Sequence, residues 1–121
     1  MRNAYIECRI ILIDPGADTE CDVFNRIETA NATALSRLAQ AFGGYTLTSG
    51  KGGWVAPDGT LHEDHVLVAD VAVPMFLPVS QAGGIVTHET ERAGMHATSV
   101  LLEVARDYAR AADQACVYVR L

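Results

Sequence analysis

Residues 43–73 constrain the fold of this chain more than any other stretch, because they contain two strand-like segments separated by a glycine-rich stretch and a turn. Residues 45–49 alternate between apolar and polar as a strand does. Residues 50–53, Gly-Lys-Gly-Gly, favour a bulge or a close backbone approach, with Trp54 packing back over a hairpin. Residues 57–59, Pro-Asp-Gly, are a strong turn signal. A β-hairpin is therefore predicted at the middle of the chain.

Four strand patterns and two helix patterns span the sequence. Residues 4–13 and 61–73 are apolar on most of both sides, which is typical of central strands, and residues 115–121 form a short final strand. Helical periodicity covers residues 18–42 and 90–112. The order strand, helix, strand, strand, helix, strand is the split βαβ arrangement of ferredoxin-like folds. We predict one α+β domain over residues 1–121, with a four-stranded antiparallel sheet and both helices on one face.

The ends of these elements are predicted from local signals. Asp18 and Thr19 can cap the first helix, and Asn31 and Thr33 are weak helix formers that would allow a break near its middle. The Gly-Gly pair at residues 43–44 ends it. Residues 74–91 show no periodicity and hold two prolines, so they are interpreted as a long connection, of the kind that is often functional.

Composition narrows the classes of function. The net charge of −6 over 121 residues disfavours nucleic acid as a partner, because no basic excess is present to displace counterions from phosphate. Three cysteines without a C-x-x-C motif are typical of reduced thiols in a cytoplasmic protein. The N-terminal residues have no signal-peptide core, and the longest apolar run is far too short to span a membrane. We expect a cytoplasmic protein that binds neither membrane nor cofactor.

Helices on one face of the sheet would leave the other face uncovered. Strand parity gives that open face an apolar centre with mixed charges around it, and such surfaces usually make contacts. A second copy of the chain, forming a homodimer, or residues 74–91 are predicted to cover it. The predicted interface residues are Tyr5, Glu7, Arg9, Ile11, Val66, Val68, Asp70 and Tyr118.

The histidines suggest a second kind of site. All four lie between His62 and His96, and His62 and His65 are flanked by carboxylates, so a zinc-like site is conceivable there. In a strand these two side chains point to opposite faces, and solvated or capping roles are the alternative. Trp54 and Lys51 are the residues predicted to bind a small ligand.

Catalytic motifs are weak in this sequence. Neither a Gly-x-Ser-x-Gly nucleophile motif nor a dinucleotide-binding fingerprint occurs, and the glycines at residues 50–53 lack P-loop spacing. Acid–base chemistry by Glu7 and Asp70 is possible, but carboxylates beside Arg9 and Arg120 on a sheet face are more often in ion pairs. The sequence predicts no catalytic residue.

The hairpin and the C-terminal strand resemble a family of small uncharacterised bacterial and phage proteins. The likeness rests on Phe-Gly-Gly-Tyr-Thr at residues 42–46, Gly-Gly-Trp at 52–54, Pro-Asp-Gly at 57–59, Glu63, and Gln-Ala-Cys-Val-Tyr-Val at 114–119. Ala115 stands where a glutamate is common. The resemblance implies no activity, but it favours an accessory or host-interacting role in a phage or mobile element.

Two functional hypotheses follow. The first is a non-enzymatic protein-interaction module that binds itself or a protein partner through the open sheet face. The alternative is a small enzyme or a ligand- or metal-binding protein with a site near Trp54 and residues 62–65.

Overall fold

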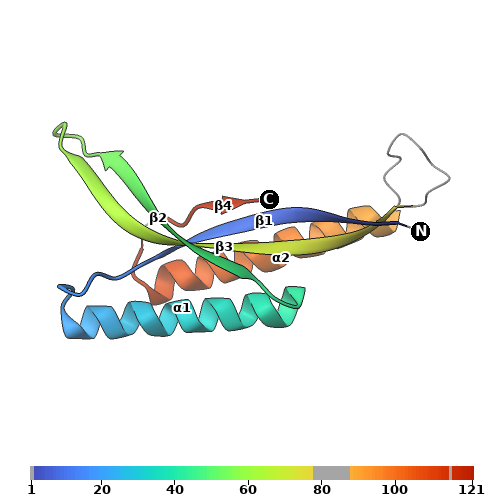
Figure 1. Ribbon diagram of the computed structural model, residues 1–121, viewed down its shortest axis with the longest axis horizontal. Helices are drawn as coiled ribbons and strands as arrows, with labels where there is room; N and C mark the ends of the chain where they lie inside the picture. The colour runs from blue at the N-terminus through green and yellow to red at the C-terminus, as the bar shows by residue number, and fades with distance from the viewer. Residues whose placement is uncertain (1, 78–87, 115) are drawn as a thin grey trace.

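The computed structural model describes residues 2–77, 88–114 and 116–121, and they form an α+β fold (Figure 1). The strand–helix–strand–strand–helix–strand order is as predicted, and the four strands form one antiparallel sheet in the order β2-β3-β1-β4. The elements are β1 (Arg2–Ile13), α1 (Cys21–Phe42), β2 (Thr46–Val55), β3 (Leu61–Leu77), α2 (His88–Ala111) and β4 (Val119–Arg120).

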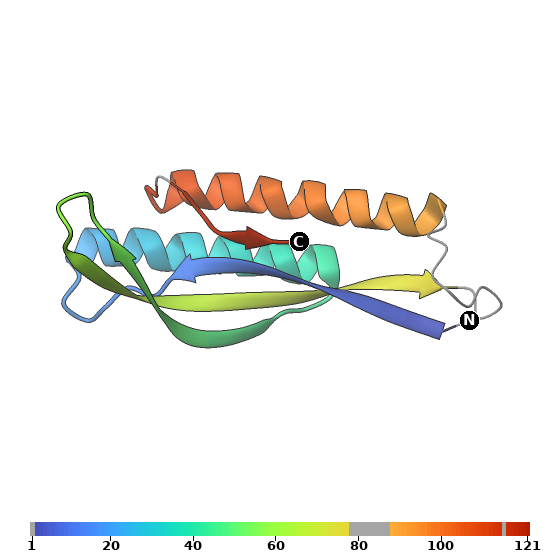
Figure 2. The same cartoon turned by 90° about the horizontal axis from the view of Figure 1, so that it is seen from above.

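Both helices pack on the same face of the sheet and run side by side in opposite directions (Figure 2). Alternate residues of the two central strands point toward them, and the apolar stripes of the helices complete the core. The buried cluster comprises Cys8, Ile10 and Leu12 of β1, Ala69, Val71 and Val73 of β3, Ala30, Ala34 and Leu38 of α1, and Ala97, Leu101, Val104, Ala105, Tyr108 and Ala112 from α2 and its end. The predicted faces of β1 and β3 are confirmed.

A buried hydrogen-bond network ties both helices to the end of β1. The Tyr108 hydroxyl donates to Asn31 Oδ1 over 2.7 Å, and it accepts from the backbone N–H of Ile13 over 2.8 Å. Asn31 Nδ2 donates to the Ile13 carbonyl over 2.8 Å. The predicted break near Asn31 and Thr33 is therefore wrong: α1 is continuous, because the Asn31 side chain bonds across to β1 rather than competing with its own helix backbone.

The glycine-rich segment is a regular strand without the predicted bulge. β2 continues through residues 50–53 to Val55, paired with β3 residue by residue, and the turn lies beyond it at residues 56–60. A Cβ added at Gly50 would lie 3.3 Å from Val66 Cγ2, so glycine leaves room for the Val66 side chain opposite it. The predicted strand end at Ser49 is wrong because backbone pairing across to β3 overrides the low strand propensity of glycine.

Three further boundaries differ from prediction. α1 begins at Cys21 with Glu20 as its N-cap and no side-chain cap; Asp18 and Thr19 belong to a preceding turn, in which the Thr19 N–H donates to the Gly16 carbonyl. Residues 74–77 extend β3 and residues 88–91 open α2, so the predicted 74–91 connection shortens to residues 78–87, which lie outside the described part.

The C-terminal strand is also shorter than predicted. β4 consists of Val119 and Arg120, although Tyr118 already accepts a hydrogen bond from the Ile11 N–H. The predicted left-handed end of the first helix is confirmed at Gly43, with φ of 83°.

The sheet is staggered, because its strands differ in length and register. At one end the β2–β3 hairpin continues past the end of β1 and curves away from the helices (Figure 1). At the other end β1 and β3 continue as a two-stranded ribbon beyond both β2 and β4. None of the helices in the described ranges carries an apolar stretch long enough to cross a membrane.

Candidate interaction surface on the open sheet face

The face opposite the helices carries rows of side chains set by the strand register. One row runs Thr46, Asp70, Arg9 and Arg120 across the four strands. The next row runs Thr48, Val68, Ile11 and Tyr118, and the Ile11 N–H joins the last pair through the Tyr118 carbonyl at 3.1 Å. The register therefore brings the predicted interface residues from β1, β3 and the β4 segment onto one surface.

An ion pair stands at the centre of the charged row. Arg9 Nε donates to Asp70 Oδ1 over 2.8 Å, and Nη2 donates to Oδ2 over 3.3 Å, so the pair is bidentate. This hydrogen bond and the charge of Asp70 raise the pKa of Arg9 above its ordinary value. The expectation that Asp70 lies in an ion pair is met, and Glu7 and Arg120 join the pair around a hollow of about 80 Å³.

The apolar part of the surface lies beside this row. Ile11, Val66 and Val68 are half-buried on the face opposite α1 and α2. Tyr118 lies beside Ile11 and is 60% exposed, and Tyr5 lies on the same face beyond the Arg9–Asp70 row and is 63% exposed. A patch of this kind, with aromatic side chains and a rim of both charge signs, has the composition of a contact surface.

Trp54 lies on the same face, near the end of the hairpin, and is held from two sides. Its ring stacks on His62 with centroids 4.6 Å apart and planes at 19°, and its indole N–H donates to Asp64 Oδ2 over 3.2 Å. It remains 52% exposed. The predicted packing of Trp54 over the hairpin is confirmed, and it leaves part of the indole open to a further contact.

The residues of the predicted ligand and metal sites do not converge. His62 shares the open face with Trp54, whereas His65 lies on the other face of β3, because three residues separate them along a strand. Lys51 also points to that other face and pairs with Glu63 at 2.8 Å. Among the side chains that the structure describes, no three from histidine, cysteine or acidic residues are grouped to hold a metal.

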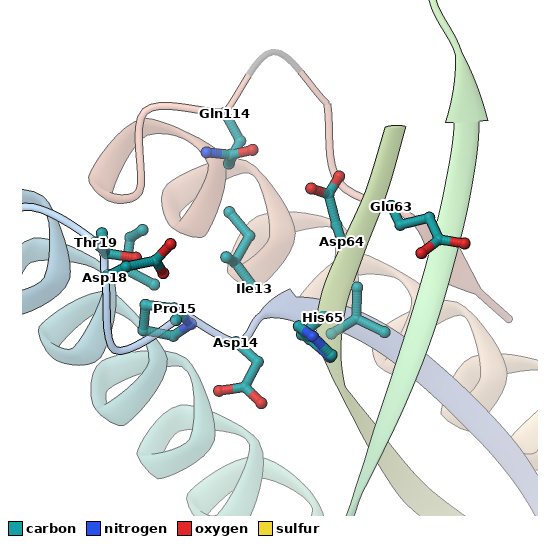
Figure 3. Close-up of a pocket in the computed structure, with 12 residues that line it drawn as sticks. Ile13, Asp14, Pro15, Asp18, Thr19, Glu63, Asp64, His65 and Gln114 are labelled. Carbon is teal, nitrogen blue, oxygen red and sulfur yellow. The ribbon is translucent and has the colours of Figure 1, made fainter. Parts of the chain in front are cut away.

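A larger cavity lies where β1 turns toward α1, and sequence reasoning did not find it. It measures about 440 Å³ and lies between the β1–α1 loop, β3 and the segment after α2 (Figure 3). Asp14, Asp18, His65 and Gln114 supply polar groups around it, and Ile13 and Ile27 supply apolar wall. The Asp-Pro-Gly sequence at residues 14–16 is the local signal in this region, and by itself it indicates only the end of a strand.

Two further carboxylates at this cavity already have partners. Asp64 accepts from the Trp54 indole, and Glu63 pairs with Lys51. Beneath the cavity, burial raises the pKa of Tyr108, while its hydrogen bond from Ile13 acts in the opposite direction. That hydroxyl is therefore a neutral structural group.

Comparison with known proteins finds no relative of this chain: no family model, no curated protein and no solved structure matches it significantly. Its class is therefore defined by its own architecture, an α+β domain with a four-stranded antiparallel sheet and both helices on one face of it.

Proposed function

We propose that this chain is a non-enzymatic protein-interaction module that associates with a second copy of itself through the open sheet face. The observation that carries the proposal is the patch of Ile11, Val66 and Val68 on the face opposite the helices, with the exposed ring of Tyr118 beside it and that of Tyr5 on the far side of the Arg9–Asp70 row. Burying this patch in a dimer removes apolar surface from water, and the aromatic rings supply contact area.

A second copy fits the charges of this face. The face holds Glu7 and Asp70 against Arg9 and Arg120, so it is locally balanced in a chain whose net charge is −6. Arg9 and Asp70 pair with each other, while neither Glu7 nor Arg120 forms an ion pair within the described residues. In a two-fold dimer the same patch meets itself, so Glu7 of each copy can face Arg120 of the other.

Charge reversal tests this pairing. Glu7→Arg and Arg120→Glu each place like charges together, and each is expected to weaken dimerisation by about tenfold or more. The double variant restores opposite charges and is expected to recover most of the affinity. Dissociation constants from sedimentation, with subunit counts from native mass spectrometry, provide the measurement.

The matched control is Glu28→Arg, which changes the charge by the same amount on the exposed outer side of α1. It is expected to leave the dissociation constant within about twofold of the unmodified chain, because it lies far from the open face. A monomeric wild-type chain at all concentrations, or a double variant no tighter than the single ones, would overturn the proposal.

The proposal also covers the fold type, the biological context and the location of the protein. We infer a ferredoxin-like fold, supported by the βαββαβ order and by the antiparallel order β4-β1-β3-β2, counted from the β4 edge. The resemblance of residues 42–63 and 114–119 to small bacterial and phage proteins supports an accessory role in a phage or mobile element. Three free cysteines support a reducing cytoplasm as its location.

The second candidate function is binding of a planar small molecule at Trp54. Its support is the fixed indole, which is held by His62 and Asp64 and still half exposed. Native mass spectrometry of the purified chain discriminates the two: a monomer carrying a retained small mass that Trp54→Ala removes would favour this candidate. An even-numbered oligomer without added mass would favour the interaction module.

A further inference from the structure

The direction of the backbone groups along β1 can be derived from two hydrogen bonds. The Asp14 N–H donates to the His65 carbonyl of β3, and the Ile11 N–H donates to the Tyr118 carbonyl beside β4. Backbone groups alternate sides along a strand, so even-numbered residues of β1 bond to β3 and odd-numbered residues point toward the β4 side.

The β4 side of β1 is uncovered over half its length. β4 ends at Arg120, opposite Arg9, whereas β1 continues back to Arg2 while still paired with β3. By the alternation, the N–H and C=O groups of Glu7, Tyr5 and Asn3 point out of the sheet on this side. Among the described residues no strand meets them, so this stretch is an exposed edge of the kind that pairs with another chain.

The opposite edge of the same ribbon is blocked. β2 covers β3 only as far as Asp70, which pairs with Thr46. Odd-numbered residues of β3 bond to β1, since the His65 carbonyl does, so even-numbered residues such as Pro74 point toward the β2 side. Proline has no N–H, and a proline directed outward is one way in which proteins prevent pairing at a strand edge. The β1 edge carries no such residue between Arg2 and Cys8.

We propose that the exposed edge of β1, centred on Tyr5, pairs antiparallel with the same edge of a second copy. The partner strand must offer outward N–H and C=O groups over the same few residues without proline, and the β1 of another copy does so. A two-fold axis near Tyr5 satisfies both edges at once, whereas a foreign peptide would satisfy only one. The result is one continuous sheet across two chains.

This edge contact is distinct from the open-face contact proposed above, and neither depends on the other. Strand pairing uses backbone groups in the plane of the sheet, and the face contact uses side chains above that plane. A chain with both two-fold contacts forms an even-numbered assembly larger than a dimer. Loss of either contact leaves a dimer held by the other, so the two proposals fail separately.

A proline substitution tests the edge without removing a bond to β3. Tyr5→Pro deletes an outward N–H, and the bonds from neighbouring residues 4 and 6 to β3 remain. Tyr5→Ala is the matched control, because it removes the same ring and keeps the N–H. We expect Tyr5→Pro to associate about tenfold or more weakly than Tyr5→Ala, measured by sedimentation across a concentration series. Equal association of the two variants would overturn the edge pairing.

Hydrogen exchange of the unmodified chain provides a second measurement that does not depend on how the proline variant folds. In the paired state the amides of Tyr5 and Glu7 are bonded, so their exchange is expected to slow with rising protein concentration, at least tenfold between dilute and associated samples. The amide of Asp14, which bonds to β3, serves as the internal reference. Fast, concentration-independent exchange at Tyr5 and Glu7 would contradict the proposal. The charge-reversal variants Glu7→Arg and Arg120→Glu report separately on the open face.

Discussion

The two faces of this sheet are built from the same strands and meet opposite environments. Along β1, Ile10 is fully buried beneath the helices, while its neighbour Ile11 points to the open face and is half-buried with no helix over it. Along β3, Ala69 and Val71 enter the core, while Val68 and Asp70 do not. The covered face holds the fold together through packing, and the open face carries spare apolar surface that the fold does not use.

Substitution of the adjacent residues Ile10 and Ile11 is expected to give the largest difference in unfolding free energy between the two faces. Ile10→Ala removes a fully buried side chain and leaves a cavity, so it is expected to lower the free energy of unfolding by about 2–5 kcal/mol. Ile11→Ala makes the same chemical change on the open face and is expected to cost about 1 kcal/mol or less in the monomer. Urea unfolding at a concentration below association measures both.

The same two variants also distinguish an effect on monomer stability from an effect on association. Ile11→Ala is expected to weaken association more than it changes monomer stability, because the part of Ile11 that stays exposed in the single chain is buried in the proposed dimer. Equal losses of unfolding free energy in the two variants would show that the open face is packed within a single chain, and the contrast between the faces would not hold.

Two tyrosines extend the comparison to hydrogen bonds. Tyr108→Phe leaves the Ile13 N–H and Asn31 Oδ1 without their partner in a buried site, so a loss of about 1–3 kcal/mol is expected. Tyr118→Phe removes a hydroxyl from an exposed ring and is expected to change stability by about 0.5 kcal/mol or less. Thermal and urea unfolding measure both; a Tyr108→Phe variant as stable as wild type would contradict the role of the network.

Much of the covered face could be predicted from the sequence, because burial leaves a regular pattern there. Ile10, Leu12, Val71 and Val73 alternate with the strand period, and Leu38 and Leu101 lie on helical stripes. The pattern specified the element order and which side of β1 and β3 faces the helices. The ion pair of Asp70 was anticipated from strand parity and charge alone.

The predictions that failed concern segments whose local structure depends on long-range contacts. Glycines at residues 50–53 favour a bulge or a close backbone approach locally, but residue-by-residue pairing with β3 makes them regular strand. Asn31 is a weak helix former, and only its bonds to Ile13 and Tyr108 explain a continuous helix. The cavity near Asp14 and Gln114 joins residues that are one hundred positions apart, and no local pattern links them.

The cysteines provide the finest test of the two faces. Cys8 is buried under the helices, whereas Cys116 and Cys21 are exposed, and burial raises the pKa of the Cys8 thiol above its ordinary value. Since the thiolate is the reactive form, Cys8 is expected to react with a thiol reagent at least about a hundredfold more slowly than the other two. Intact-mass spectrometry over time counts the labels, with a urea-unfolded sample in which all three react as the control.

The raised pKa of Cys8 also fixes the direction of a pH effect. The folded state holds the thiol proton more tightly than the unfolded state, so this contribution to stability is complete below the unfolded pKa. It is lost as pH rises from that value through the folded pKa. Stability is therefore expected to fall at alkaline pH, and Cys8→Ala is expected to reduce the slope while Cys116→Ala leaves it unchanged. Equal slopes in both variants, measured by urea unfolding between neutral and alkaline pH, would show that the environment of Cys8 does not differ from that of the exposed thiol.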